Sequence, residues 1–84
     1  MKKLLKDINK HIGRKLRERR LSLRLSQREL AAAIAVTFQQ VQKYETGTNS
    51  MSPERIYRSA MLLQVSPGWF FEGFEKPGHH DGVR

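Results

Sequence analysis

The chain of 84 residues contains no cysteine and only three prolines. Without cysteine, neither a disulfide framework nor a zinc site built on thiolates is possible. Its longest uninterrupted apolar stretch, residues 30–36, is far shorter than the roughly 20 residues that cross a bilayer. The opening MKKLLK is similar to the start of a signal peptide, but charged and polar residues interrupt the apolar run that would have to follow. We therefore expect a cytoplasmic protein.

Residue patterns that carry catalysis are missing as well. The sequence has no glycine-rich phosphate loop and no pair of carboxylates at a usable spacing, so we do not expect an enzyme. Residues 75–84 have the composition of a flexible tail. They include His79, His80 and Asp81, but adjacent residues on a flexible chain do not preform a metal site. We expect neither a metal nor another cofactor.

Acidic residues are half as numerous as basic ones, 8 against 16, which gives a net charge of +8. The imbalance is local, because residues 1–24 carry ten basic and two acidic residues, whereas residues 25–84 carry six of each. The basic segment also has an apolar stripe at helical spacing, which Arg20 shares with Leu5, Ile8, Ile12, Leu16 and Leu23. This pattern predicts an amphipathic basic helix within residues 1–24.

A phosphate backbone is the partner that such a helix favours. A helix lying on an anionic membrane has a similar pattern. In so short a chain, however, the apolar stripe is needed to cover the core, so we expect no membrane partner.

Residues 26–47, SQRELAAAIAVTFQQVQKYETG, predict two short helices joined by a tight turn. Ser26 can cap the first helix, and Glu29, three residues later, completes a capping box. The apolar spacing and the small alanines extend this helix over residues 27–34.

The second helix of the pair is predicted over residues 38–46. A turn at residues 35–36 precedes it, Thr37 can cap it, and Gly47 can end it in a left-handed conformation. Two short helices in this arrangement are typical of a helix-turn-helix, whose second helix enters the major groove of DNA.

The outward face of this second helix carries residue types that suit base recognition. Glutamine can pair with adenine, lysine can donate to guanine, and an apolar side chain can lie against a thymine methyl. Because the N-terminal residues of such a helix meet the base edges, we predict base contacts first by Phe38, Gln39 and Lys43, then by Gln40 and Gln42. Simple solvation of a helix face is the alternative for any one glutamine. Phe38 either touches a base or fills the core.

The sequence resembles the Cro/C1-type helix-turn-helix transcriptional regulators, the XRE family, over residues 12–73. The resemblance rests on IGRKLRERR, LSQRELA, AVT, QKYETG and IYRSAMLLQVSPGWFF, in this order. It implies an all-α fold: a compact five-helix, lambda-repressor-like domain over residues 1–74, with the helix-turn-helix at its second and third helices. It also implies a homodimer, most often a repressor, that binds a palindromic double-stranded DNA operator through the third helix.

The resemblance assigns individual roles too. Gln27 and Thr37 stand at positions that touch DNA phosphates in this family. An arginine of the first helix commonly pairs with a glutamate near the end of the third, which implies a structural ion pair between Arg20 and Glu45. Backbone amides near residues 46–48 are expected to bind phosphates as well, together with the side chains of Arg14, Arg17, Thr46, Thr48 and Asn49.

Two positions depart from the family pattern, because Arg24 and Ala35 stand where glycine is usual. If the backbone follows the family, both residues need a positive φ, which costs roughly 1 kcal/mol or more at each position. These departures concern stability and remove no DNA contact.

Two further helices are predicted beyond a polar loop. Serine caps followed by proline at the first helical position indicate helices over residues 53–63 and 67–72. The last helix carries three consecutive aromatic residues, which spread over about 200° of arc, so one face cannot bury them all. We predict a dimer interface formed by Trp69, Phe70, Phe71 and Phe74. In the alternative, Trp69 and one phenylalanine close the core and the other is partly exposed.

A different function stays open. The chain could be an antitoxin or co-regulator that uses the same fold mainly to bind a protein partner, since the aromatic residues 69–71 would serve either association. An RNA-binding function is less consistent with the sequence, which lacks the aromatic platform on which bases usually stack.

Overall fold

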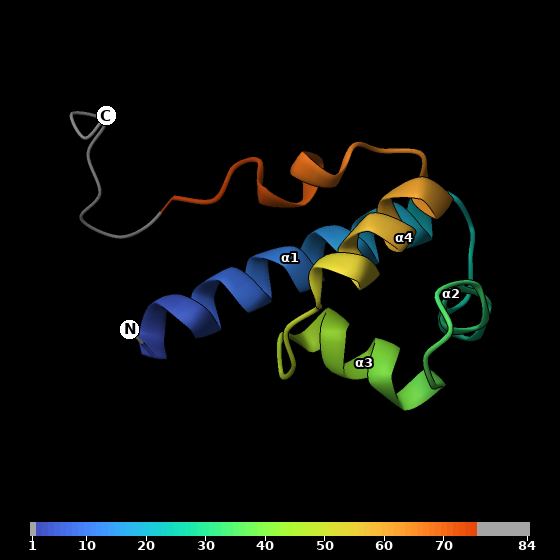
Figure 1. Cartoon of the computed structure of the whole chain (residues 1–84), viewed down its shortest axis with the longest axis horizontal. Helices are drawn as coiled ribbons and strands as arrows, with labels where there is room; N and C mark the ends of the chain where they lie inside the picture. The colour runs from blue at the N-terminus through green and yellow to red at the C-terminus, as the bar shows by residue number, and fades with distance from the viewer. Residues whose placement is uncertain (1, 76–84) are drawn as a thin grey trace.

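The computed structural model describes residues 2–75, and these residues form four α-helices and one 3-10 helix. The elements are α1 (Lys2–Ser22), α2 (Gln27–Ala33), α3 (Phe38–Thr46), α4 (Pro53–Leu63) and η1 (Pro67–Phe71). Figure 1 shows the contacting helices α2 and α3 below the long α1, α4 overlapping the C-terminal half of α1 in this view, and η1 above them. The all-α fold predicted from the sequence is confirmed.

Two elements differ from their predicted form. The fifth helix is a short 3-10 helix and not an α-helix, and it ends at Phe71, one residue early. Helix α2 ends at Ala33, and Ile34 is its C-terminal capping residue. Within the described residues, no helix combines the length and the apolar character that crossing a bilayer requires.

Local chemistry at the helix ends explains where the elements begin. The Ser26 hydroxyl accepts from the Glu29 amide at 2.9 Å, and the Glu29 carboxylate accepts from the Ser26 amide at 2.7 Å. The Thr37 hydroxyl accepts from the Gln40 amide at 3.1 Å in the same way. These bonds satisfy amides that would otherwise have no partner in the first helical turn.

Left-handed residues end the helices. Gly47 has φ 80° at the end of α3. Arg24 and Ala35, the two residues at usual glycine positions, both have φ 61°, and Gln64 ends α4 with φ 62°. A residue with a β-carbon in the left-handed backbone region costs roughly 1 kcal/mol or more. The chain therefore makes the turns after α1, α2 and α4 with residues that are energetically unfavourable in that conformation.

The core lies where all five elements meet. Completely buried side chains come from each of them: Leu16, Leu30, Ile34, Val41, Leu63 and Phe70. The apolar stripe of α1 extends beyond this core, because Leu5 is 57% exposed. Its predicted place in the core stripe is therefore wrong. The N-terminal turns of α1 project past α3 and α4, so no other helix of the described residues covers it there (Figure 1).

Helix α1 crosses the end of α3 at very short range. A β-carbon on Gly13 would collide with the Tyr44 carbonyl oxygen and would lie 2.8 Å from that of Glu45. A β-carbon on Gly47 would lie 2.8 Å from the Lys10 α-carbon. Each helix therefore presents a bare glycine to the backbone of the other, and the distance between α1 and α3 depends on both.

Replacing Gly13 with alanine tests this crossing. Alanine is the better helix former by about 1 kcal/mol, but overpacking against a fixed backbone costs about 1–3 kcal/mol or more. We expect a net loss of about 1–2 kcal/mol in the free energy of urea unfolding. Gly68→Ala is the control, because a β-carbon there meets nothing within 4 Å. Equal stability of the two variants would contradict the close crossing.

Candidate nucleic-acid interface

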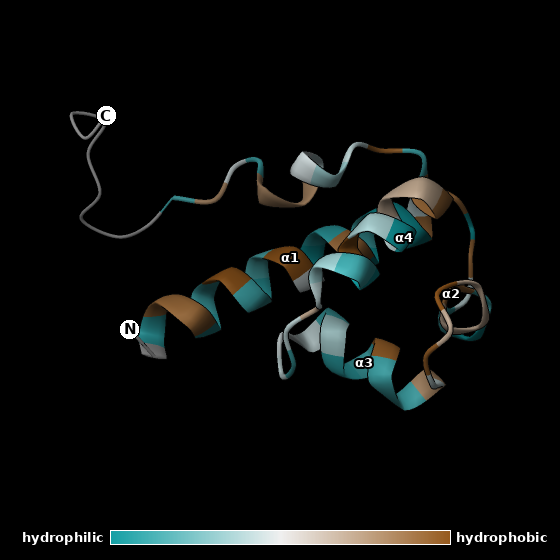
Figure 2. Cartoon of the chain, viewed as in Figure 1, coloured by the Kyte–Doolittle hydropathy of each residue, from teal (hydrophilic) through white to brown (hydrophobic). Residues whose placement is uncertain are grey.

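Helix α3 separates an inner face from an outer face. Val41, Tyr44 and Glu45 are buried against the other helices. Gln39, Gln42 and Lys43 are exposed on the opposite side, as the helical repeat requires. Figure 2 shows α3 as mostly hydrophilic, so its outer face presents amide and ammonium groups to solvent.

The other two predicted base-contacting residues lie to the sides of α3. Gln40 is half-buried, and its side-chain Oε1 accepts from the side-chain Nδ2 of Asn49 at 3.4 Å. Phe38 is half-buried beneath the Arg28 guanidinium, whose central carbon lies 4.3 Å from the ring centroid. Phe38 is not among the residues of the hydrophobic core, so the alternative in which it fills the core is wrong.

A buried ion pair fixes α3 to α1. Arg20 donates from Nε to Glu45 Oε2 at 2.6 Å and from Nη2 to Glu45 Oε1 at 3.0 Å, and the two side chains are only 8% and 3% exposed. Arg20 Nη1 also donates to the Leu25 carbonyl at 2.8 Å. This two-bond geometry matches the planar guanidinium to the carboxylate and holds both helices in one orientation.

Gln27 joins the same network from the start of α2. Its Nε2 donates to Glu45 Oε1 at 2.9 Å, so the side chain, predicted to touch a phosphate, is turned toward the ion pair. Glu45 therefore receives hydrogen bonds from α1 and α2 while it belongs to α3. The relative placement of the two helix-turn-helix elements depends on this one carboxylate.

The loop after α3 differs from the prediction in one respect. The amides of Gly47 and Thr48 donate to the carbonyls of Tyr44 and Lys43 at 3.1 and 2.9 Å, and the Asn49 amide donates to Lys43 at 3.2 Å. These amides close the end of α3, so the expectation that backbone amides near residues 46–48 bind phosphates is wrong for Gly47 and Thr48. The hydroxyls of Thr46 and Thr48 remain exposed.

Basic residues of α1 flank the crossing with α3. Lys6, Lys10, Gly13 and Arg17 follow one another at spacings of four, three and four residues, which places them along one face of α1. Because Gly13 contacts the end of α3, the charged members of this face lie beside α3. Arg14 lies off this row, and its Nη2 is 3.1 Å from His11 Nδ1.

His11 is a buried residue that no sequence motif pointed to. Its Nε2 lies 2.9 Å from the Glu72 carbonyl oxygen, and its ring packs 5.4 Å from that of Phe74. Donation from Arg14 to Nδ1 requires the proton to sit on Nε2, which then donates to Glu72. Burial lowers the pKa of His11, and the charges of Arg14 and Lys15 lower it further. The neutral ring thus holds the segment after η1 on α1.

The aromatic residues of η1 have separate roles. Phe70 is completely buried in the core, so its prediction as a dimer-interface residue is wrong. Trp69 is half-buried against the Phe70 ring, at 5.2 Å between centroids, with the Lys15 ammonium 4.1 Å from its own ring centroid. Phe71 is 43% exposed. A short 3-10 helix turns its side chains in different directions, so Phe70 is buried, Trp69 packs against the core and Phe71 is partly exposed. The alternative in which Trp69 and one phenylalanine close the core is confirmed.

Two short helices, each capped by a hydroxyl, meet at a turn with a left-handed residue, and the second carries an exposed polar face. This geometry defines a helix-turn-helix DNA-binding protein. Comparison with known proteins agrees, since a helix-turn-helix family model matches residues 16–70. The chain belongs to the helix-turn-helix family of XRE-type transcriptional regulators, a family of DNA-binding proteins and not of enzymes.

Named relatives extend over most of the chain. It is 43% identical over 77 residues to an uncharacterized transcriptional regulator in the ATPase CF(0) region of Rhodospirillum rubrum, covering 90% of this chain and 71% of that protein. It is 40% identical to an uncharacterized HTH-type transcriptional regulator of Sinorhizobium medicae, covering 98% of this chain and 58% of the relative. It is 33% identical to the HTH-type transcriptional regulator DicA of Escherichia coli, covering 80% of this chain and 50% of the relative. The chain thus spans little more than half the length of several relatives.

Metal binding has no structural support in the part of the chain that the structure describes. Among residues 2–75, no three histidine, aspartate or glutamate side chains come together as metal ligands would. His79, His80 and Asp81 lie outside the described residues, as does the predicted tail apart from Glu75.

Glu45→Gln tests the buried network. The substitution leaves Arg20 charged and buried without a counter-charge, which costs about 3–5 kcal/mol. We expect a loss of that order in the free energy of unfolding by urea. Glu54→Gln is the control, since Glu54 pairs with Arg58 at 2.9 Å on the exposed surface of α4, where such a pair contributes about 0–1 kcal/mol. Unchanged melting of Glu45→Gln would contradict the account.

His11 predicts a pH dependence of stability. Because the pKa of His11 is lowered in the folded protein, the unfolded chain takes up a proton first as the pH falls through about 6.5. The contribution of the neutral His11 ring to the free energy of unfolding is therefore complete above that pH and is lost as the pH decreases toward the lowered pKa. His11→Gln should flatten the unfolding free energy between pH 7.5 and 5.5. Parallel curves for the two proteins would rule out this role.

Proposed function

We propose that this chain is a sequence-specific regulator, a repressor that binds a palindromic double-stranded DNA operator as a homodimer in the cytoplasm. Helix α3 enters the major groove in this function. The observation that carries the proposal is the exposed row of Gln39, Gln42 and Lys43, on a helix that the buried Arg20–Glu45 pair fixes in place. Without that rigidity, amide side chains would be solvated and would select no sequence.

Base selection belongs to the outer face of α3. Gln39 and Lys43 are the primary base contacts, because both are exposed on the outer face, Gln39 near the beginning of the helix and Lys43 one turn further along. Gln42 shares that face. Gln40 contacts bases only after its hydrogen bond to the Asn49 side chain breaks. Phe38 offers its ring edge to a thymine methyl from under Arg28.

Phosphate contacts surround this face and supply affinity that does not depend on sequence. Thr37 and Gln27 lie at the beginnings of α3 and α2, and the second N–H of the Gln27 amide is the one we assign to a phosphate. The remaining contacts come from side chains of α1 and of the loop after α3: Arg14, Arg17, Thr46, Thr48 and Asn49.

The dimer is supported by exposed aromatic surface near the end of the described chain. Phe71 is 43% exposed, and Trp69 and Phe74 are half-buried. Two-fold symmetric proteins match two-fold symmetric operators, so a dimer through these residues explains a palindromic site. Phe70 takes no part in it, because the core covers its side chain completely.

A protein-binding function, as an antitoxin or co-regulator, is favoured by one observation. Tyr57 and Met61 lie one turn apart on α4 and are 57% and 62% exposed, so a second apolar surface exists away from α3. Sedimentation of the purified protein separates the two functions. A dimer supports the homodimeric repressor, and a monomer in the absence of a partner favours the protein-binding function.

Gln39→Ala tests the proposed function most simply. We expect a loss of about 1–3 kcal/mol per half-site on an operator selected from random duplexes, because a paired base contact disappears. Binding to random DNA should hardly change. Arg17→Ala is the matched comparison, since it should weaken both duplexes alike and reduce the salt slope by about 1. Equal losses of Gln39→Ala on operator and random DNA would refute the assignment.

A further inference from the structure

The guanidinium of Arg28 joins the beginnings of α2 and α3. Arg28 is the second residue of α2, and Phe38 is the first residue of α3. The central carbon of the guanidinium lies 4.3 Å from the Phe38 ring centroid, which is within the range of a cation–π contact. The Arg28 side chain is exposed to solvent. A charged group from α2 therefore stands in the open, held against the first residue of α3.

Helix stability does not explain an arginine at this position. The first turn of a helix is its positive end, which disfavours a cation. One turn further along α2 stand Ala31 and Ala32, which offer no carboxylate. The adjacent Glu29 carboxylate is engaged with the Ser26 amide. Arg28 takes part in no ion pair among residues 2–75, so its charge is left for a ligand.

The Phe38 ring has no place in the core that would explain it. It is half-buried, yet it belongs neither to the hydrophobic core nor to the side chains packed against the core. Its contact with Arg28 reduces the rotamer freedom that an exposed arginine otherwise has. A ring provides no oxygen or nitrogen acceptor, so the five N–H donors of the guanidinium can still bind a ligand. Phe38 thus positions a planar donor group without occupying it.

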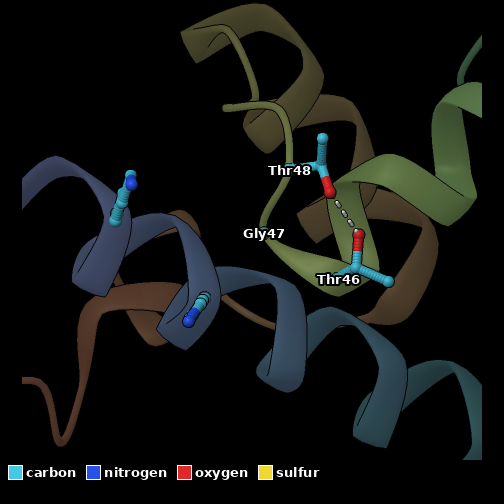
Figure 3. A pocket seen from close by; sticks show the side chains of 5 residues that line it. Thr46, Gly47 and Thr48 are labelled. Carbon is cyan, nitrogen blue, oxygen red and sulfur yellow. Dashed lines mark hydrogen bonds between the residues drawn. The ribbon is translucent and has the colours of Figure 1, made fainter.

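The end of α3 differs from its beginning. There the hydroxyls of Thr46 and Thr48 lie 2.9 Å apart, and Figure 3 shows them turned toward each other. Both side chains are short, so their hydroxyls stay close to the backbone that carries them. A guanidinium stands at the end of a long side chain. Arg28, at the beginning of α3, therefore has a reach that these two threonines lack.

The docking geometry of a helix-turn-helix places Arg28 at the edge of the major groove. The N-terminal residues of the second helix meet base edges, and the first helix crosses the DNA backbone. Phe38 begins the second of these helices, whereas Arg28 belongs to the first. An arginine of α2 that is held over the beginning of α3 is thus directed from the backbone toward the bases.

The Phe38 contact favours a base as the ligand. A phosphate can be bound by a point charge, which needs no planar group held in one orientation. The fixed fork of an arginine matches O6 and N7 of guanine, the commonest specific contact in the major groove. The 4.3 Å between Arg28 and the Phe38 ring is close to the spacing of about 3.4 Å between stacked base pairs. The two side chains are therefore spaced to meet neighbouring base pairs.

We propose that Arg28 is a specificity-determining residue of α2 that donates to O6 and N7 of a guanine. The Phe38 ring holds the guanidinium in place and meets the thymine methyl of the neighbouring base pair. This inference rests on the proposed function and deepens it, because it adds a base contact from outside α3. Each preferred half-site then contains a guanine beside that thymine, in addition to the bases that Gln39 and Lys43 select.

The test selects operators from random duplexes with the wild-type protein, Arg28→Ala and Arg28→Lys. Arg28→Ala should reduce the preference for the guanine by about five- to hundredfold per half-site, the discrimination of a two-bond contact, and keep the preference due to Gln39. Arg28→Lys retains the charge but not the planar fork. It should lose most of the guanine preference with an unchanged salt slope. Thermal unfolding of each protein shows that the fold is retained.

A modified base separates the guanine from the phosphates. Replacing this guanine with 7-deazaguanine removes the N7 acceptor and changes no charge. Binding of the wild type should weaken about tenfold, and binding of Arg28→Ala should not change. Phe38→Leu should also reduce the guanine preference, because the guanidinium loses its ring. Arg58→Ala is the control, since Arg58 pairs with Glu54 on α4, and it should alter no base preference.

Three outcomes would overturn the inference. If Arg28→Ala weakens every sequence alike and Arg28→Lys binds like the wild type, Arg28 contacts a phosphate, although an intact preference due to Gln39 would preserve the proposed function. If Phe38→Leu keeps the full guanine preference, the ring does not position the arginine. A wild-type protein that selects no sequence overturns both proposals.

Discussion

The carboxylate of Glu45 is the group on which the rest of the structure depends. It accepts hydrogen bonds from Arg20 of α1 and Gln27 of α2 while it sits on the inner face of α3. A buried charge of this kind tolerates little displacement, because each lost bond leaves a polar group without a partner. Gly13 and Gly47 add a steric constraint, since they allow the α1 and α3 backbones to touch. Together these contacts turn two short helices into a rigid unit.

Rigidity on the inner face has a consequence on the outer one. Because α3 is fixed to α1, the basic face of α1 and the polar face of α3 keep one relative orientation. In the function we propose, charge and selectivity are separate properties of adjacent surfaces: lysine and arginine hold a DNA backbone, and the amides of Gln39 and Gln42 discriminate between bases. Phe71, Tyr57 and Met61 are also exposed, and in the functions we propose they serve association between proteins.

The parts that the sequence predicted well are those determined by neighbouring residues. Ser26, Thr37 and Gly47 act on amides and carbonyls within a few positions, so their roles in ending helices were readable from spacing alone. The ion pair between Arg20 and Glu45 was predicted only from the family resemblance, because the two residues are far apart in the sequence and no local pattern connects them.

The parts that failed depend on what lies across the fold. Which aromatic of η1 is completely buried, namely Phe70, is decided by a 3-10 geometry that the spacing did not indicate. Leu5 has the spacing of a core residue but projects past the other helices. Gly13 lies within a helix, where glycine costs about 1 kcal/mol, and such a residue can indicate that another backbone approaches closely. The sequence alone did not show that this backbone belongs to α3.

The central claim is that the fixed outer face of α3 reads DNA. The most direct measurement follows the side-chain amide resonances of the glutamines by nuclear magnetic resonance during addition of a duplex that the protein selects. The account predicts large shifts for Gln39 and Gln42 and little change for Gln64, which is exposed at the end of α4. Shifts at Gln64 with unchanged resonances of Gln39 and Gln42 would contradict it.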